Sequence, residues 1–168
     1  MSKNLTDLFN SKFDEHGKYL DELQSIFNAT KPDSSLDLLE SFTQVGPLNV
    51  RELISQEKLE VDYSLPIMHN LDVEDSEGVY KWSGQVKDGQ PIGFGRRDET
   101  IKRQCTDVFY FRDPDGHLDK YFARIFSARG NYYIGWTKDG KLHGKGKLVS
   151  KHPAFVQEGE WEDGNFLE

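Results

Sequence analysis

The sequence predicts an α+β protein in which an N-terminal α-helical module is followed by an elongated, single-layer antiparallel sheet of stacked β-hairpins. Apolar residues recur every three or four positions in the N-terminal part, which is typical of amphipathic helices. Further along, short alternating runs are separated by glycines at a repeated spacing, which is typical of hairpin repeats. We therefore divide the chain into an acidic helical module over residues 1–60, a linker over 61–79 and a basic repeat array over 80–168.

Three helices are expected in the module. Residues 3–28 predict one amphipathic helix with an interruption near Gly17. Residues 30–42 begin with a proline and capping residues and then bring their apolar residues onto one face. Residues 49–60 predict a third helix just after a Gly-Pro pair, and residues 62–78, which become acidic toward their end, predict an extended linker.

The repeat array contains two segments that match at every glycine. Residues 82–95 and 133–146 both follow the pattern aromatic-x-Gly-x4-Gly-x3-Gly-x-Gly and share Lys-Asp-Gly at the turn. A third copy starts at Gly159 and predicts a truncated last unit. The step between the first two copies is about twice the step between the last two, so a degenerate middle unit is expected near residues 107–122. The glycines to which we assign a structural role are Gly84, Gly89, Gly93, Gly95, Gly135, Gly140, Gly144, Gly146, Gly159 and Gly164.

Asp-Gly pairs in the array predict hairpin turns, because glycine takes positive φ without steric cost. A single hairpin of this kind cannot bury its own apolar face, so each aromatic ring is expected to pack on the glycine backbone of the next hairpin. The glycines are not expected to bind phosphate, since residues 140–146 lack the Gly-x4-Gly-Lys-Ser/Thr spacing. The turn pairs are Asp88-Gly89, Asp139-Gly140 and Asp163-Gly164.

The glycine pattern is similar to that of the MORN (membrane occupation and recognition nexus) repeat family, and the resemblance covers residues 80–168. Trp161 stands where the family usually carries a tryptophan. The resemblance implies a MORN-type array of stacked hairpins. It also implies a non-enzymatic scaffold role in a larger cytoskeletal, ciliary or membrane-associated assembly.

Charge is distributed unevenly along the chain, whose formal net charge is −8. Residues 1–80 hold 6 Lys/Arg and 16 Asp/Glu. Residues 81–151 hold 15 Lys/Arg and 8 Asp/Glu, and residues 152–168 hold no Lys/Arg and 5 Asp/Glu. Either the acidic helices fold back and neutralise the basic repeats, or the repeats present a basic face to an anionic partner. The acidic net charge and the lack of a recognition motif argue against nucleic acid as that partner.

The sequence favours a cytoplasmic location. Cys105 is the single cysteine, so no internal disulfide is expected and a reducing compartment is favoured. No apolar run reaches the roughly 18 residues of a transmembrane helix, and the N-terminus has neither a signal-peptide core nor the composition of a presequence. The MORN resemblance adds an association with the cytoskeleton or a cilium.

Residues that could support catalysis or metal binding are scattered. The five histidines have no metal-ligand spacing, and Cys105 would need a distant histidine to act as a nucleophile. Asp113, Asp115 and Asp119 hint at a calcium loop, but the segment is too short for an EF-hand and a type I turn explains it with less assumption. We therefore expect no catalytic activity, no metal and no cofactor.

Two functions fit the sequence. In the first, the repeats form a groove that docks a helix or extended segment of another protein subunit. The aromatic residues expected to line or support this groove are Trp82, Phe94, Tyr133, Trp136 and Trp161. In the alternative, the basic face of the repeats binds anionic lipid weakly, through Lys138, Lys141, Lys145 and Lys147. The open edge of the last hairpin also favours a homodimer or a place inside a complex.

Overall fold

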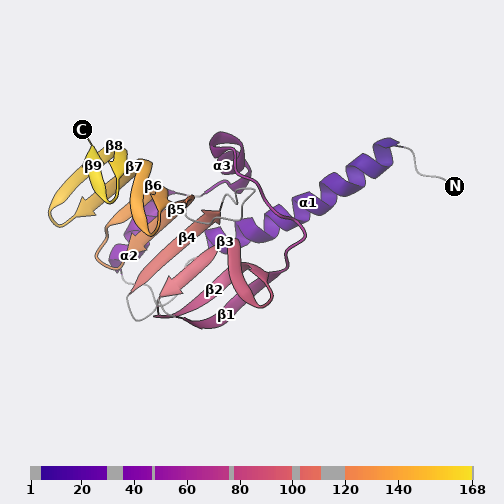
Figure 1. Ribbon diagram of the computed structural model, residues 1–168, viewed down its shortest axis with the longest axis horizontal. Coiled ribbons are helices and arrows are strands. Elements are labelled where there is room, and N and C mark those ends of the chain that lie inside the picture. The colour runs from indigo at the N-terminus through magenta and orange to yellow at the C-terminus, as the bar shows by residue number, and fades with distance from the viewer. Residues whose placement is uncertain are drawn as a thin grey trace.

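In the part of the chain that it describes, the computed structural model contains three N-terminal helices, α1 (Leu5–Asn28), α2 (Leu36–Val45) and α3 (Val50–Glu57), followed by nine strands in one sheet (Figure 1). None of the helices within the described ranges is long and apolar enough to span a membrane. The structure describes residues 5–29, 36–46, 48–75, 78–99, 103–110 and 120–167, and the side chains of these residues except 5–15, 36–39, 75 and 110.

Each strand of the sheet pairs with the next strand of the chain in the antiparallel direction, so the spatial order equals the sequence order. The expected α+β class, with helices first and an antiparallel sheet in hairpin order after them, is confirmed. The strands are β1 (Ile67–Asp75), β2 (Gly78–Lys87), β3 (Gln90–Glu99), β4 (Gln104–Tyr110), β5 (Lys120–Ser127), β6 (Tyr132–Lys138), β7 (Lys141–Lys151), β8 (Ala154–Glu162) and β9 (Asn165–Leu167).

The Asp-Gly turns are confirmed at all three predicted places. Asp88 and Gly89 join β2 to β3 with φ angles of 53° and 75°, the two positive values of a type I′ turn. The pair 139–140 joins β6 to β7 and the pair 163–164 joins β8 to β9, again with two positive φ angles each. The repeated sequence therefore produces a repeated backbone conformation.

Aromatic rings pack on glycines, as expected, but these glycines lie on the other strand of the same hairpin and not, as the sequence analysis predicts, on the next hairpin. A Cβ added at Gly95 would lie 2.3 Å from the ring of Trp82, and one added at Gly146 would lie 2.3 Å from Cζ of Tyr133. A Cβ at Gly135 would lie 2.4 Å from the Cα of Gly146, its partner across the strand pair. Only glycine lets backbones and rings approach this closely, so these positions accept no side chain.

The C-terminal half of α1 and helix α3 pack on one face of the sheet, which we call the helix-facing face. The rings of Phe27 in α1 and Phe109 in β4 lie 4.6 Å apart, between centres. The helices and the sheet therefore share one apolar core, whose burial is the main favourable term in folding. Its buried residues are Leu23, Ile26, Phe27, Val50, Leu53, Leu59, Phe94, Phe109 and Phe122.

Helix α2 covers a neighbouring part of the helix-facing face. Its Phe42 packs on Phe126 of β5, with ring centres 4.3 Å apart. Its Glu40 forms an ion pair with Lys151 of β7 at 2.6 Å. A separate apolar cluster lies on the opposite face of the sheet, because successive residues of a strand point to opposite faces. Its buried residues, on β2 and β4, are Tyr80, Trp82, Val86 and Val108.

Helix α3 is held at both ends by local signals. The side chain of Asn49 accepts a hydrogen bond from the backbone nitrogen of Glu52 at 3.1 Å, which caps the helix N-terminus. The helix ends at Lys58, which takes a left-handed conformation with φ of 54°. Gln24 of α1 accepts a hydrogen bond from the backbone nitrogen of Val50 at 2.9 Å, so the start of α3 is tied to α1.

Two buried arginines bind the C-terminal end of α1. Arg96 of β3 and Arg124 of β5 both donate hydrogen bonds to the carboxylate of Asp107 on β4, the closest at 2.6 Å and 2.7 Å respectively. Both arginines also donate to the backbone oxygen of Phe27, at 3.0 Å and 3.4 Å, and Arg96 donates to that of Ala29. An α-helix leaves its last carbonyl oxygens unpaired and favours cations at that end. The arginines therefore fix the end of α1 on the sheet.

Two boundaries differ from the sequence analysis. The expected linker over residues 61–79 contains strand β1, which pairs with β2 and extends the sheet toward the N-terminus. Helix α1 continues through Gly17 without the expected interruption, since a single glycine costs a helix only about 1 kcal/mol relative to alanine. The sheet is thus longer than its sequence signal indicates, and the first helix is continuous.

The degenerate middle unit supplies strands β4 and β5, which pair with each other over residues 104–110 and 121–127. Val108 and Ala123 take the place of the repeat glycines in this pair, since Val108 pairs with Gly95 and Ala123 pairs with Gly135. The segment 111–119, with the aspartates at 113, 115 and 119 that hinted at calcium, lies outside the described residues. The last hairpin ends in the short strand β9, which pairs with residues 160–162 of β8.

We predict that Gly135→Ala lowers the free energy of unfolding by about 3 kcal/mol, because the added methyl group meets backbone atoms that cannot move aside. Gly17→Ala is the matched control: its Cβ would lie 3.8 Å from the nearest atom, an ordinary contact. This control should raise the stability by up to about 1 kcal/mol, since alanine favours helix. Urea unfolding of both variants measures the two changes. Equal stability of Gly135→Ala and the unmodified chain would refute the close-packing explanation.

Candidate functional site

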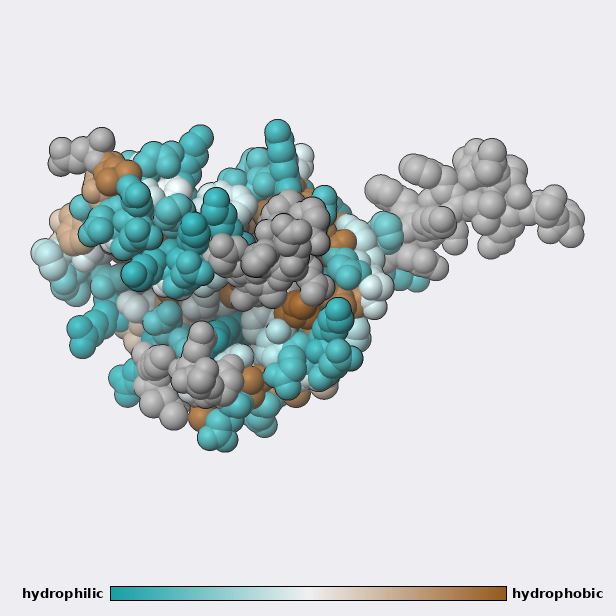
Figure 2. Space-filling model, in the orientation of Figure 1, coloured by the Kyte–Doolittle hydropathy of each residue, from teal (hydrophilic) through white to brown (hydrophobic). Residues whose placement is uncertain are grey.

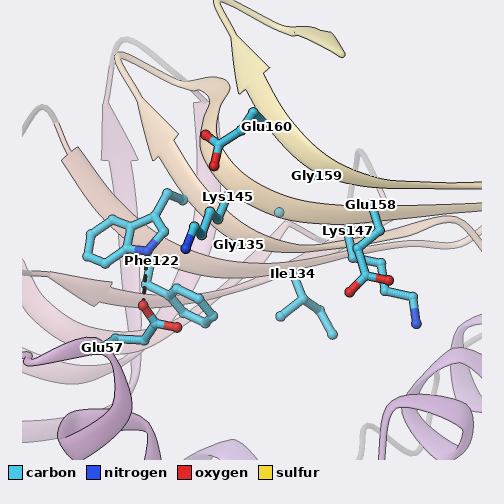
Figure 3. Close-up of a pocket in the computed structure, with 11 residues that line it drawn as sticks. Glu57, Phe122, Ile134, Gly135, Lys145, Lys147, Glu158, Gly159 and Glu160 are labelled. Carbon is cyan, nitrogen blue, oxygen red and sulfur yellow. Dashed lines mark hydrogen bonds between the residues drawn. The ribbon is translucent and has the colours of Figure 1, made fainter. Parts of the chain in front are cut away.

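The candidate site is a groove on the helix-facing face of β6, β7 and β8, beside the end of helix α3 (Figure 3). Its volume is about 490 Å³. Hydrophilic residues dominate the visible surface around these strands (Figure 2). The residues that line the groove are Glu57, Phe122, Ile134, Gly135, Trp136, Lys145, Gly146, Lys147, Glu158, Gly159 and Glu160.

The groove side chains form three rows, one on each strand. Residues two apart on a strand point to the same face, and the strand register places Lys145 opposite Glu160 and Lys147 opposite Glu158. An apolar row, a basic row and an acidic row therefore lie side by side. The rows are Ile134 and Trp136 on β6, Lys145 and Lys147 on β7, and Glu158 and Glu160 on β8.

The basic and acidic rows are not paired with each other. Although the register sets them opposite one another, none of the four charged side chains has an ion-pair or hydrogen-bond partner within the described part of the chain. Lys145, Glu158 and Glu160 are exposed, and Lys147 is half-buried. These charges are therefore available to a ligand that enters the groove.

Trp136 is one of two aromatic residues that line the groove, and Phe122 is the other. Nε1 of Trp136 donates a hydrogen bond to Oε2 of Glu57 at 3.1 Å, and this contact links β6 to α3. Its ring meets that of Phe122 edge to face, with centres 5.8 Å apart and planes at 84°. The indole is therefore held in one orientation, and its half-buried ring still faces the groove.

A row of three glycines crosses the strands under the groove. Gly135 pairs with Gly146, and Gly146 pairs with Gly159, on β6, β7 and β8 respectively. On the opposite face, Tyr133 covers Gly146 and Phe166 covers Gly159. The rings of Tyr133 and Phe166 occupy the space that side chains at Gly146 and Gly159 would need on that face.

The predicted aromatic residues separate into two sets. Trp82, Phe94, Tyr133 and Trp161 are buried, with relative exposures of 3%, 1%, 2% and 4%. Their rings pack within the fold, so they support the sheet and do not line the groove. Trp136 alone of the five lines it.

The four lysines predicted to bind an anionic surface also lie in two different places. Lys145 and Lys147 line the groove, together with three glutamates, so two positive and three negative charges give this lining a net charge of −1. Lys138 and Lys141 lie elsewhere, opposite each other beside the turn between β6 and β7. The four lysines therefore do not form one basic face.

The acidic half of the groove was not predicted from the sequence. Glu158 and Glu160 alternate along the chain just as Lys145 and Lys147 do, so the alternation itself was a usable signal once β7 and β8 were paired. Glu57 had no such signal, because the contact between α3 and Trp136 depends on how the helices pack on the sheet.

The described side chains do not form a metal-binding cluster. In the part of the chain that the structure describes, no three His, Cys, Asp or Glu residues are placed to hold a metal ion. Cys105 is 1% exposed and packs with Phe126 and Tyr132 in a second apolar cluster. A thiol buried in this way is inert toward large reactants.

No protein-family model matches this chain, and no curated protein matches it. The likeness to MORN repeats therefore stands on the glycine pattern of residues 82–95 and 133–146.

Tyr133, on strand β6 of the groove, makes the stability of the folded chain depend on pH at alkaline values. Its hydroxyl donates a hydrogen bond to the backbone oxygen of Trp136 at 2.7 Å. Burial raises the pKa of Tyr133 well above its ordinary value, and the negative charge of Glu160 raises it further. The folded chain therefore keeps this hydroxyl protonated at pH values where the unfolded chain ionises it.

We predict that the stability contributed by the neutral Tyr133 is complete below about pH 10, the ordinary tyrosine pKa, and is lost as the pH rises above it. In Tyr133→Phe this part of the decline should be absent, so stability should fall less steeply with pH between about 10 and 11. Urea unfolding at several alkaline pH values compares the two slopes. Identical slopes would show that Tyr133 does not titrate differently in the folded and unfolded chains.

Proposed function

We propose that this chain is a non-enzymatic, MORN-type interaction subunit that docks a segment of a partner protein in the groove, within a larger assembly. The groove itself carries the proposal, because an oriented tryptophan on its floor is bordered by charged side chains that have no partners in the described residues. Buried aromatic anchors surrounded by a polar rim provide most of the affinity in protein interfaces. The MORN resemblance favours a cytoskeletal, ciliary or membrane-associated assembly.

Binding to anionic lipid is the alternative, and one observation supports it. Lys120, Lys138 and Lys141 stand directly opposite one another on β5, β6 and β7. Like charges placed across strands repel each other, and an anion would relieve that repulsion. The groove itself, with its net negative lining, does not suit an anionic surface. A docked protein segment therefore uses more of the observed features than a lipid does.

We predict that Trp136→Ala lowers recovery of partner proteins at least tenfold in affinity purification from native extract, since central aromatic anchors contribute about 2 kcal/mol or more. Phe155→Ala is the matched control, because Phe155 is an exposed aromatic residue on β8 that does not line the groove. Quantitative mass spectrometry compares both variants with the unmodified chain. Thermal unfolding confirms that each variant is folded.

Glu160→Lys provides a second groove variant, because this side chain is exposed and its replacement leaves the core intact. Loss of the same partners in Trp136→Ala and Glu160→Lys, with full recovery in Phe155→Ala, supports docking in the groove. Full recovery in all three variants contradicts it. In that case, sedimentation with phosphatidylserine vesicles and loss of binding in the double variant Lys138→Glu, Lys141→Glu would establish the lipid alternative.

A further inference from the structure

The order of the three rows in the groove restricts the chemistry of its occupant. The apolar row lies on β6, the basic row on β7 and the acidic row on β8, so the basic row is always in the middle. A complementary surface needs apolar, acidic and basic groups in the same order. This step rests on the proposed function, since it assumes that the groove docks a protein segment.

The width of the rows matches a helix better than an extended chain. Neighbouring strands lie about 4.8 Å apart, so three rows span about 10 Å. That width is close to the diameter of an α-helix with its side chains, which is about 10–12 Å. An extended segment would cover the width of about one strand and would leave two rows uncovered.

The spacing along the rows also matches a helix. Two residues on one strand, such as Lys145 and Lys147, are separated by about 6.6 Å along the strand. Residues i and i+4 of a helix are separated by about 6 Å along its axis and lie on the same face. Acidic residues at i and i+4 of a partner helix would therefore face both lysines.

The same face of the sheet already binds helices in its other half. Helix α1 packs on β3 and α2 packs on β5, through apolar residues of the helix-facing face. The groove continues this face onto β6, β7 and β8, where the charged rows have no partner in the described residues. A helix from another protein would extend the packing that the chain's own helices begin.

From these observations we infer that the groove binds an amphipathic helix of a partner protein in which an acidic stripe lies between an apolar stripe and a basic stripe. The apolar stripe packs on Ile134 and Trp136. The acidic stripe pairs with Lys145 and Lys147, and the basic stripe pairs with the glutamates of β8.

Two designed helical peptides test this inference. The first carries the stripes in the order apolar, acidic, basic, and the second has its Glu and Lys residues exchanged, so the two have the same composition. Fluorescence anisotropy at low salt measures the binding of each labelled peptide to the full chain. The unmodified chain should bind the first peptide at least tenfold more tightly than the second. Reversing the direction of the second peptide cannot rescue it, because its middle stripe stays basic.

The matched protein variant exchanges the two charged rows by Lys145→Glu, Lys147→Glu, Glu158→Lys and Glu160→Lys. This exchange keeps the net charge and keeps opposite charges on facing residues of β7 and β8. The variant should prefer the second peptide. If the fourfold variant does not fold, the single change Lys145→Glu, at an exposed residue, replaces it. This change should reduce the preference for the first peptide.

Reversal of the preference supports the inference. Equal binding of both peptides, or no binding of either, overturns it. If neither peptide binds while Trp136→Ala still loses partner proteins, the groove docks a segment of another kind and the proposed function stands. If Trp136→Ala, Glu160→Lys and Phe155→Ala all recover partners fully, the proposed function fails as well.

Discussion

The buried cluster of Arg96, Asp107 and Arg124 is the interaction on which the rest of the structure depends. Its two positive charges exceed its one negative charge, and the carbonyl oxygens at the end of α1 balance the excess. Burial disfavours the charge of Arg96, but the charge and hydrogen bonds of Asp107 more than offset this and raise the pKa of Arg96 above its ordinary value. The cluster therefore stays charged, and it orders α1 against three neighbouring strands.

The position of α1 decides which part of the sheet is left for a partner. Once α1, α2 and α3 are seated, the helix-facing side of β3, β4 and β5 is occupied, and the groove opens on β6, β7 and β8. The two interpretations of the charge pattern fare differently: the helical module does fold back on the repeats, whereas a basic face for an anionic partner stays a prediction. The helical module uses the positive charge of Arg96, Arg124 and Lys151 within the fold, whereas the lysines of the groove have no partner among the described residues.

The local features could be predicted from the sequence, and the features that depend on strand register could not. Asp-Gly turns follow from single-residue stereochemistry, so their positions were correct. The rings pack on glycines of their own hairpin and not of the next one, because strand pairing decides which glycine a ring meets. Trp82 and Trp136 have the same side chain but point to opposite faces of the sheet. Trp82 precedes its repeat glycine, Gly84, by two residues, whereas Trp136 follows its repeat glycine, Gly135, by one. The role of Asp107 required the pairing of β4 with both neighbours, and the degenerate middle unit gave no glycine pattern from which to derive it.

The most direct test of this account is hydrogen exchange of the α1 amides in Asp107→Asn. Removing one partner of a buried ion pair costs about 3–5 kcal/mol, so amides of residues 19–28 should exchange at least about a hundredfold faster than in the unmodified chain. Arg51→Gln, which breaks the exposed pair with Asp21 of α1, should change the same rates less than about fivefold. Unchanged protection of α1 in Asp107→Asn would contradict the central role of the buried cluster.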